Sequence, residues 1–336
     1  MIDLSTYYLG RKLRSPFVAS SGPLSKDLRN LQKMEDAGAG AVVLHSLFEE
    51  QILMEGQSLD RFLSAGADSY AEFASYFPDI GPYDLGPRSY LQHLEAAKKA
   101  LKIPVIASLN GSSLTGWVRY ARDMENAGAD AIELNIYFLP ASFETSGAQI
   151  EESYCDLVSA VKAQVRIPVA VKLGPFFTSL PNIAYRLECA GAGALVLFNR
   201  FYQPDFDLEA MDAKPNLKLS TSDELLMRLH AVALLSSRLS VDLAVTGGVH
   251  TAEDAIKGIF AGAHVVMTTS ALLQRGIDHL RHMQDDVVQW MQQHDYDSVS
   301  QMRGAMNAGN VGDPEVYQRA NYLKTLGSYE SRLQTR

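Results

Sequence analysis

Two short segments rich in glycine and hydroxyl residues have the composition of an anion-binding site. They are Thr246-Gly247-Gly248 and Thr268-Thr269-Ser270, and each follows an apolar run and precedes a helical pattern. Glycines let backbone N–H groups approach an anion, hydroxyls add donors, and helix N-termini add positive potential. The pair predicts a phosphate cradle made by Thr246, Gly247, Gly248, Thr269 and Ser270. The alternative interpretation is two ordinary tight turns.

Three further polar residues end apolar runs and suit contact with an electron-rich ring. Lys172 closes VAVK, Asn135 closes IELN and Asn199 closes LVLFN. Lysine is expensive to bury unpaired, so a lysine here suggests contact with an anionic or electron-rich ligand, although it could also be a rim residue whose head reaches water. An amide offers both a donor and an acceptor to a heterocycle, or it can cap a turn.

Small and titratable residues end the first two apolar runs. Ser20, Ser21 and Gly22 permit close backbone approach to a ligand, and His45 and Ser46 end the second run. A histidine can titrate near neutral pH. We therefore keep His45 as a candidate acid or base, beside the simpler interpretation that it is structural.

Two repeated motifs indicate how these residues are positioned. The first motif ends a helical stretch with Ala-Gly and continues into an apolar run; it occurs at 36–44, 126–134, 189–197 and 260–268. The second motif begins the other apolar runs; it occurs at 15–21, 103–109, 167–173 and 241–247. Short, wholly apolar runs are typical of parallel strands covered on both faces. Eight strands are expected near 17–21, 41–45, 104–109, 131–135, 168–173, 194–198, 242–246 and 264–268.

Strict alternation of these strands with helical patterns predicts a single α/β domain over 1–336, folded as a (β/α)₈ TIM barrel. The barrel is expected at about 15–291, followed by a helical tail at about 292–336. An open doubly wound sheet is the competing topology. Long insertions follow the second, fourth and sixth strands, on the face where such barrels place their chemistry.

Composition limits the function classes. The 336 residues include 30 basic and 39 acidic ones, a net charge of −9, which disfavours nucleic-acid binding. No apolar run reaches the ~20 residues that span a bilayer, and no signal peptide is recognisable. A cytoplasmic protein is expected. Two cysteines provide neither a disulfide framework nor a metal motif, so no metal is predicted.

From SPFVASSGPL through LAVTGGVHTAEDAIKGIFAGAHVVMTTSALL, the chain resembles the class 1 dihydroorotate dehydrogenases. The resemblance implies an FMN cofactor whose phosphate is held by Gly247, Gly248, Thr269 and Ser270. It also implies flavin-ring contacts from Ala19, Ser20, Asn135, Lys172 and Asn199. Members of this branch are cytoplasmic and usually dimeric, which implies a homodimer here.

The substrate side departs from the family pattern. The family has a Cys or Ser base after the fourth-strand Asn, and Phe138 occupies that position here. The family's lysine after the second strand is His45 in this chain. The Asn-rich segment that holds orotate is replaced by SYFPDIGPYDLGPR at 75–88. Loss of the base alone removes ~10²–10⁴-fold in rate.

The leading hypothesis is therefore an FMN-dependent oxidoreductase of CH–CH donors with an altered substrate pocket, which is not a genuine dihydroorotate dehydrogenase. His45 and Tyr137 are the candidate replacement acid or base, and Arg88 is a candidate for a substrate carboxylate. The alternatives are a catalytically silent flavin protein or electron-transfer subunit, a genuine dihydroorotate dehydrogenase of pyrimidine biosynthesis, and a flavin-free aldolase using Lys172. The expected partners are a small-molecule substrate and an electron-transfer protein, with no membrane.

Overall fold

The computed structural model describes residues 2–51, 87–111, 114–138, 141–200, 204–214, 216–312, 317 and 325–327. Most of the predicted substrate segment at 75–88 lies outside these residues. Only its last two positions, Pro87 and Arg88, are described, and both belong to the first turn of a helix. Arg88 is exposed there.

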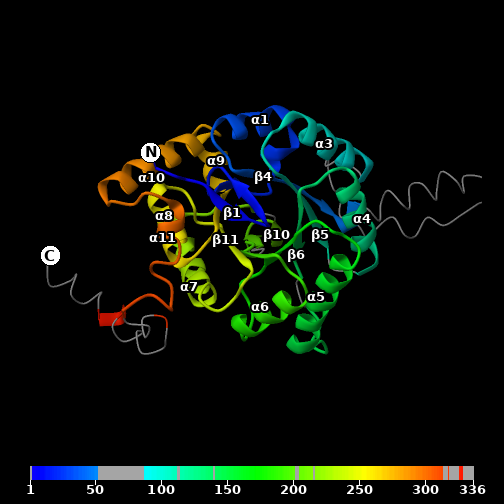
Figure 1. The fold of residues 1–336 in the computed structure, drawn as a ribbon. Coiled ribbons are helices and arrows are strands. Elements are labelled where there is room, and N and C mark those ends of the chain that lie inside the picture. The colour runs from blue at the N-terminus through cyan, green and yellow to red at the C-terminus, as the bar shows by residue number, and fades with distance from the viewer. Residues whose placement is uncertain are drawn as a thin grey trace, which may run out of the picture.

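Eight parallel strands close into a barrel, which confirms the predicted (β/α)₈ fold (Figure 1). The order around the barrel is β11-β12-β3-β4-β5-β6-β7-β8. The strands are β3 Phe17–Ala19, β4 Ala41–Phe48, β5 Val105–Gly111, β6 Ala131–Ile136, β7 Val169–Leu173, β8 Ala194–Leu197, β11 Asp242–Thr246 and β12 Val265–Thr268. All eight lie where the repeated motifs predict them, and β4 continues three residues beyond the expected end.

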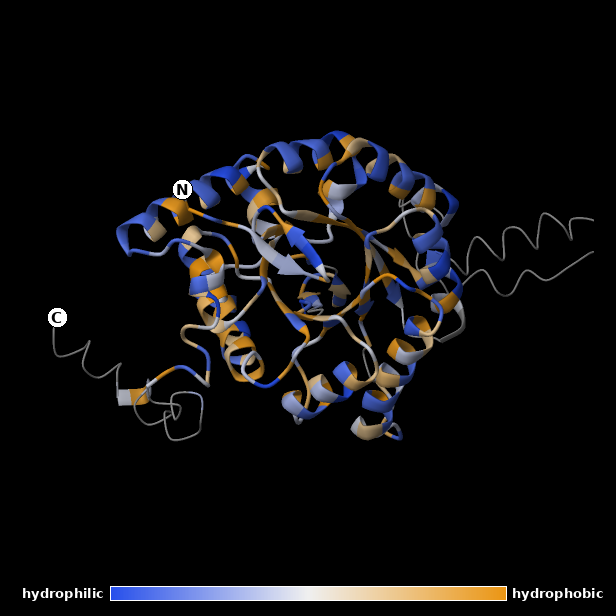
Figure 2. Cartoon of the chain, viewed as in Figure 1, coloured by the Kyte–Doolittle hydropathy of each residue, from blue (hydrophilic) through white to orange (hydrophobic). Residues whose placement is uncertain are grey.

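Helices surround the barrel as a ring (Figure 1). They are η1 Pro23–Lys26, α1 Leu28–Asp36, α3 Pro87–Ala100, α4 Leu114–Asn126, α5 Gly147–Lys162, α6 Leu180–Cys189, η3 Ser222–Glu224, α7 Leu225–Leu235, α8 Ala252–Ala261, α9 Ser270–Arg275, α10 His279–Gln293 and α11 Val299–Met302. Figure 2 shows hydrophilic and hydrophobic residues mixed along these helices, as expected of helices with one buried face. None of the described helices is long and apolar enough to cross a membrane.

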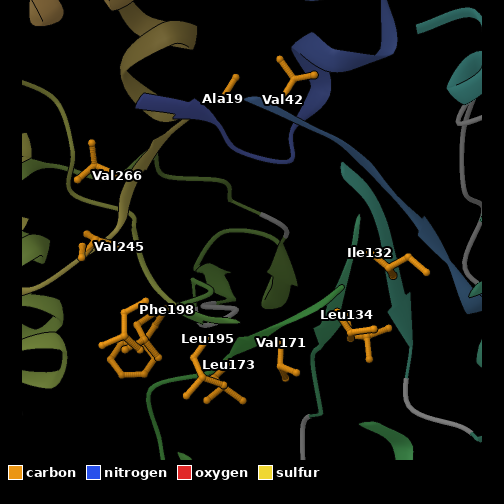
Figure 3. Packing of buried hydrophobic residues seen from close by; sticks show 14 of the residues in the cluster. Ala19, Val42, Ile132, Leu134, Val171, Leu173, Leu195, Phe198, Val245 and Val266 are labelled. Atoms are coloured by element: carbon orange, nitrogen blue, oxygen red, sulfur yellow. The ribbon is translucent and has the colours of Figure 1, made fainter. Parts of the chain in front are cut away.

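Alternation along the strands separates two sets of buried side chains. One set faces the helices and includes Ile132, Leu134 and Val171, which appear in Figure 3. The other set fills the barrel interior and consists of smaller residues such as Ala131 and Ala170. Because successive strand residues point to opposite faces, Glu133, Asn135 and Lys172 share the interior face with the second set.

A hairpin closes the N-terminal end of the barrel. Strands β1 Thr6–Tyr8 and β2 Arg11–Leu13 pair antiparallel, and Tyr8, Leu9 and Leu13 pack with the interior set. The Leu9 N–H donates to Asp242 Oδ2 at 2.7 Å, and Thr6 Oγ1 donates to the His264 carbonyl at 2.9 Å. The sequence patterns did not reveal this element.

A second hairpin lies in the insertion after the sixth barrel strand. Strands β9 Asp205–Asp207 and β10 Asp212–Lys214 pair antiparallel. The chain then returns through 216–221 to η3. This return segment brings Ser220 to the C-terminal mouth of the barrel, as described below.

Candidate functional site

A cavity of 220 Å³ lies at the C-terminal ends of the barrel strands. It connects Lys172 with both turns that were predicted to bind an anion. Of the residues predicted from the sequence, those that line it are Ser20, Ser21, Gly22, Lys172, Asn199, Thr246, Gly247, Gly248, Thr269 and Ser270. The fold thus brings residues from five strand ends into one space.

Ala19 and Asn135 do not line this cavity. The Ala19 side chain is buried in the set that faces the helices (Figure 3). Asn135 contacts a residue of the cavity wall: its Oδ1 accepts a hydrogen bond of 2.6 Å from Asn199 Nδ2. The two predicted amides therefore meet, and Asn135 fixes the orientation of the amide that lines the cavity.

The Gly247-Gly248 turn has a backbone that only glycine adopts easily. Its φ angles are +79° and +87°, in the left-handed region. A Cβ on Gly247 would lie 2.7 Å from Arg228 Nη2, and one on Gly248 would lie 2.6 Å from the backbone nitrogen of Leu225. Side chains are thus excluded, so the backbone itself forms this part of the cavity wall.

Arg228 supports the glycine turn from behind. It is 3% exposed, and its Nε donates to the Thr246 carbonyl at 2.6 Å. Its Nη1 donates to the Glu224 carbonyl, and Nη2 lies 3.7 Å from Glu224 Oε2. Burial lowers the pKa of Arg228, and the Glu224 charge opposes that shift. The sequence analysis missed this residue because it lies in an ordinary helical pattern.

The second turn is bonded to the end of the first barrel strand. Thr269 Oγ1 donates to the Ser20 carbonyl at 2.9 Å, and Ser20 Oγ lies 3.4 Å from Thr246 Oγ1. A Cβ on Gly22 would lie 2.6 Å from Thr269 Cγ2, so the first loop can pack closely here only as glycine. These contacts join three strand ends around the cavity.

Lys172 pairs with a buried carboxylate inside the barrel. Its Nζ lies 3.7 Å from Glu133 Oε1, and the two side chains are 8% and 0% exposed. Neither Glu133 oxygen has a hydrogen-bond partner. Burial raises the pKa of Glu133, and the Lys172 charge opposes that rise. Period-2 alternation from Asn135 could have placed Glu133 inside the barrel, but the sequence analysis did not single it out.

His45 lies in an irregular part of β4, where the register to β5 shifts between Val43 and Ser46. It is 9% exposed, and its Nδ1 has no hydrogen-bond partner. Burial lowers its pKa to about 4, with smaller contributions from His93 and Lys26. His45 is therefore neutral at pH 7 and a weak base in this environment.

Tyr137 and Phe138 line a different cavity, of 490 Å³, between the loops after β6 and β7. Its walls include five aromatic side chains, and the Tyr154 ring packs edge-on against Phe177. The carboxylate of Glu151 in the wall is already paired with Arg186 at 3.4 Å. The other wall residues are Ile136, Ala141, Gly147, Ile150, Gly174, Pro175, Phe176 and Thr178. This lining suits an uncharged ligand.

No group of three or more metal-ligating side chains occurs in the described part of the chain. The donors around the 220 Å³ cavity are instead hydroxyls, the Asn199 amide, backbone N–H groups, the Lys172 ammonium and the Arg200 guanidinium. This donor set, together with a glycine turn that a Cβ would block, fits the phosphate of a nucleotide.

The chain is similar to known proteins over most of its length. A family model described as "Dihydroorotate dehydrogenase" matches residues 3–291. The chain is 27% identical over 308 residues to the catalytic subunit of dihydroorotate dehydrogenase B (NAD(+)) of Thermoplasma acidophilum, covering 90% of this chain and 99% of that protein. The corresponding subunit of Methanocaldococcus jannaschii is 27% identical over 301 residues, covering 86% and 94%.

A further relative is named for a different activity. The NAD-dependent dihydropyrimidine dehydrogenase subunit PreA of Escherichia coli is 25% identical over 353 aligned positions, covering 97% of this chain and 83% of that protein. The similar proteins therefore include enzymes named for two different dihydropyrimidine substrates.

Proposed function

Because the chain belongs to the dihydroorotate dehydrogenase family, we propose that it is an FMN-dependent oxidoreductase that acts on a small CH–CH donor. The observation that carries this proposal is the single cavity that joins Lys172 to two glycine- and hydroxyl-bearing turns. When bound, FMN would supply the redox chemistry by accepting a hydride from the substrate.

The residues of the chain have separate roles in this proposal. Backbone N–H groups of Gly247 and Gly248, with the hydroxyls of Thr269 and Ser270, would hold the phosphate. Lys172 would place a positive charge where reduction adds negative charge. Its partner Glu133 keeps this ammonium at a fixed position at the end of β7.

We propose further that dihydroorotate is not the substrate. On our reading of the family motif, Phe138 would stand at the position of the proton acceptor, and phenylalanine has no group that accepts a proton. His45, the candidate replacement, has its pKa lowered to about 4 by burial. The aromatic cavity beside Tyr137 supports a substrate that is less polar than an orotate-like carboxylate.

The names of two relatives support a protein partner. The Thermoplasma acidophilum protein is named a catalytic subunit, and PreA of Escherichia coli is named a subunit. We propose that electrons leave this chain through a separate electron-transfer protein, and that the chain works in the cytoplasm as a homodimer.

The test is an absorbance spectrum of the purified protein after addition of FMN, followed by anaerobic addition of dihydroorotate. We expect a bound-flavin spectrum and little bleaching. Rapid bleaching by dihydroorotate would refute the substrate proposal and would favour a genuine dihydroorotate dehydrogenase with a replacement base. Absence of FMN binding would refute the proposed function as a whole.

A further inference from the structure

Ser220 lies where the two anion-binding turns meet. It comes from the return segment after β10, lines the 220 Å³ cavity and is 2% exposed. Its backbone N–H donates to Ser270 Oγ at 3.3 Å, and its Oγ accepts from the Gly248 N–H at 3.4 Å. One hydroxyl therefore contacts the glycine turn, while its own backbone contacts the hydroxyl turn.

The same hydroxyl contacts a buried histidine. His250 is 5% exposed, and its Nε2 lies 2.9 Å from Ser220 Oγ. The backbone of His250 is fixed on both sides, because its N–H donates to Asp254 Oδ2 at 3.0 Å and its carbonyl accepts from His279 Nε2 at 2.8 Å. The roles proposed above use neither Ser220 nor His250.

The Ser220 hydroxyl can make this contact in two ways, either as donor or as acceptor. A hydroxyl has one hydrogen to donate and two lone pairs to accept with. If His250 is neutral and carries its single hydrogen on Nδ1, the Ser220 hydroxyl must donate to Nε2 and has nothing left to donate to a ligand. If Nε2 is protonated, His250 and Gly248 fill both lone pairs, and the hydroxyl hydrogen is free to turn toward the cavity.

We propose that Ser220 is an additional ligand for a phosphate monoester in this cavity, and that His250 is a positioning residue whose proton controls whether the Ser220 hydroxyl can donate. With FMN as the phosphate source, the inference rests on the proposed function; with inorganic phosphate it does not. Binding of the phosphate and protonation of His250 then favour each other.

Burial and the neighbouring carboxylates act on the pKa of His250 in opposite directions. Burial lowers its pKa most, and Arg275 and His279 act in the same direction. Asp254 and Glu224 oppose them. A phosphate in the cavity would add negative charge beside this cluster and raise the His250 pKa.

The first test compares flavins with and without a phosphate. Binding of FMN and riboflavin is measured by fluorescence quenching between pH 6 and pH 8. We expect Ser220→Ala to weaken FMN binding by about tenfold or more, the value of one hydrogen bond to a charged group, and to leave riboflavin binding unchanged. Ser236→Ala is the matched control, because it deletes a hydroxyl that bonds the Ala261 carbonyl outside the cavity.

A second variant separates the histidine proton from the titration of the phosphate itself. His250→Gln keeps an N–H donor but cannot titrate in this range. We compare the FMN affinity of the unmodified chain with that of His250→Gln and expect this ratio to fall as pH rises through the His250 pKa. The fall should be about tenfold for each unit by which bound phosphate raises that pKa. A ratio that stays constant with pH would overturn the role of His250.

NMR titration of His250 provides a readout that does not depend on flavin. We expect its pKa to rise on addition of FMN and of inorganic phosphate, and to rise less in Ser220→Ala. If phosphate raises the pKa but FMN does not bind, the proposed function fails and this inference stands. If FMN binds and Ser220→Ala has no effect on its affinity, this inference fails and the proposed function stands. If neither anion raises the pKa, this inference fails.

Discussion

Replacing Lys172 should expose the energetic cost of the carboxylate beneath it. In the intact chain the Lys172 ammonium is the cation that faces Glu133, 3.7 Å away, and neither Glu133 oxygen has a hydrogen-bond partner. In Lys172→Met that carboxylate remains in the barrel interior without a compensating charge. Breaking a buried pair by removing one partner typically costs about 3–5 kcal/mol, and we expect a loss of that size at pH 8.

The loss should depend on pH with a defined sign. Burial already raises the pKa of Glu133 above its unfolded value, and removal of Lys172 takes away the charge that opposes this rise. A carboxyl with a raised folded pKa favours the native state below its unfolded pKa, and that contribution is lost as pH rises through the folded pKa. Lys172→Met should therefore be less destabilised at pH 5.5 than at pH 8, by about 1.4 kcal/mol for each unit of additional rise.

Urea unfolding of the flavin-free protein at the two pH values is the assay. The control is the double variant Glu133→Met/Lys172→Met, because replacing a whole buried ion pair by apolar residues is often neutral or stabilising. We expect the double variant to recover most of the stability and to lose the pH dependence. A loss below about 1 kcal/mol in Lys172→Met, equal at both pH values, would refute the claim that the pair is energetically coupled.

Three further predictions concern other parts of the barrel. Gly247→Ala should destabilise the chain by about 1–2 kcal/mol, because φ is +79° there, and it should also weaken FMN binding. Unfolding experiments measure the first effect and flavin titrations the second. Unchanged FMN binding would contradict the proposed phosphate cradle. His45→Phe should make the stability of the fold less sensitive to acid. Since folding lowers the His45 pKa from 6.5 to about 4, the free energy of unfolding of the intact chain should fall by about 3 kcal/mol as pH falls through this range. An identical dependence of stability on pH in both proteins would be contrary evidence. Asp242→Ala should loosen the N-terminal hairpin, since Asp242 Oδ2 accepts a hydrogen bond from the Leu9 N–H. We expect faster hydrogen exchange of the Leu9 amide. An unchanged exchange rate would argue against this contact as an anchor of the hairpin.

The barrel was predictable because its signal is local and repeated. Each Ala-Gly helix end followed by an apolar run occupies a few adjacent residues, and all eight strands formed at those places. The capping interaction of Thr251 with Asp254 at the start of α8 is likewise local, since the two residues are three apart. The N-terminal hairpin escaped prediction because its strands are three residues long and gain their stability from contact with the barrel interior.

The candidate site was predictable only in part. Glycine and hydroxyl residues at strand ends could be recognised from their position after each apolar run. Ser220 and His250 could not, because they are 30 residues apart and meet only through the return segment after β10. Arg228 resembles any helical arginine until the fold places its guanidinium against the Thr246 carbonyl.

The hairpin over the N-terminal end limits the routes by which ligands can reach Lys172. With Tyr8, Leu9 and Leu13 sealing one end of the barrel, a molecule can reach the ammonium only from the opposite mouth. In an assay that replaces the proposed electron-transfer protein by a small artificial acceptor, the electron donor and the acceptor would have to use the same entrance, so the first must leave before the second binds. Steady-state kinetics with two such reactants should follow a substituted-enzyme pattern, with parallel double-reciprocal lines.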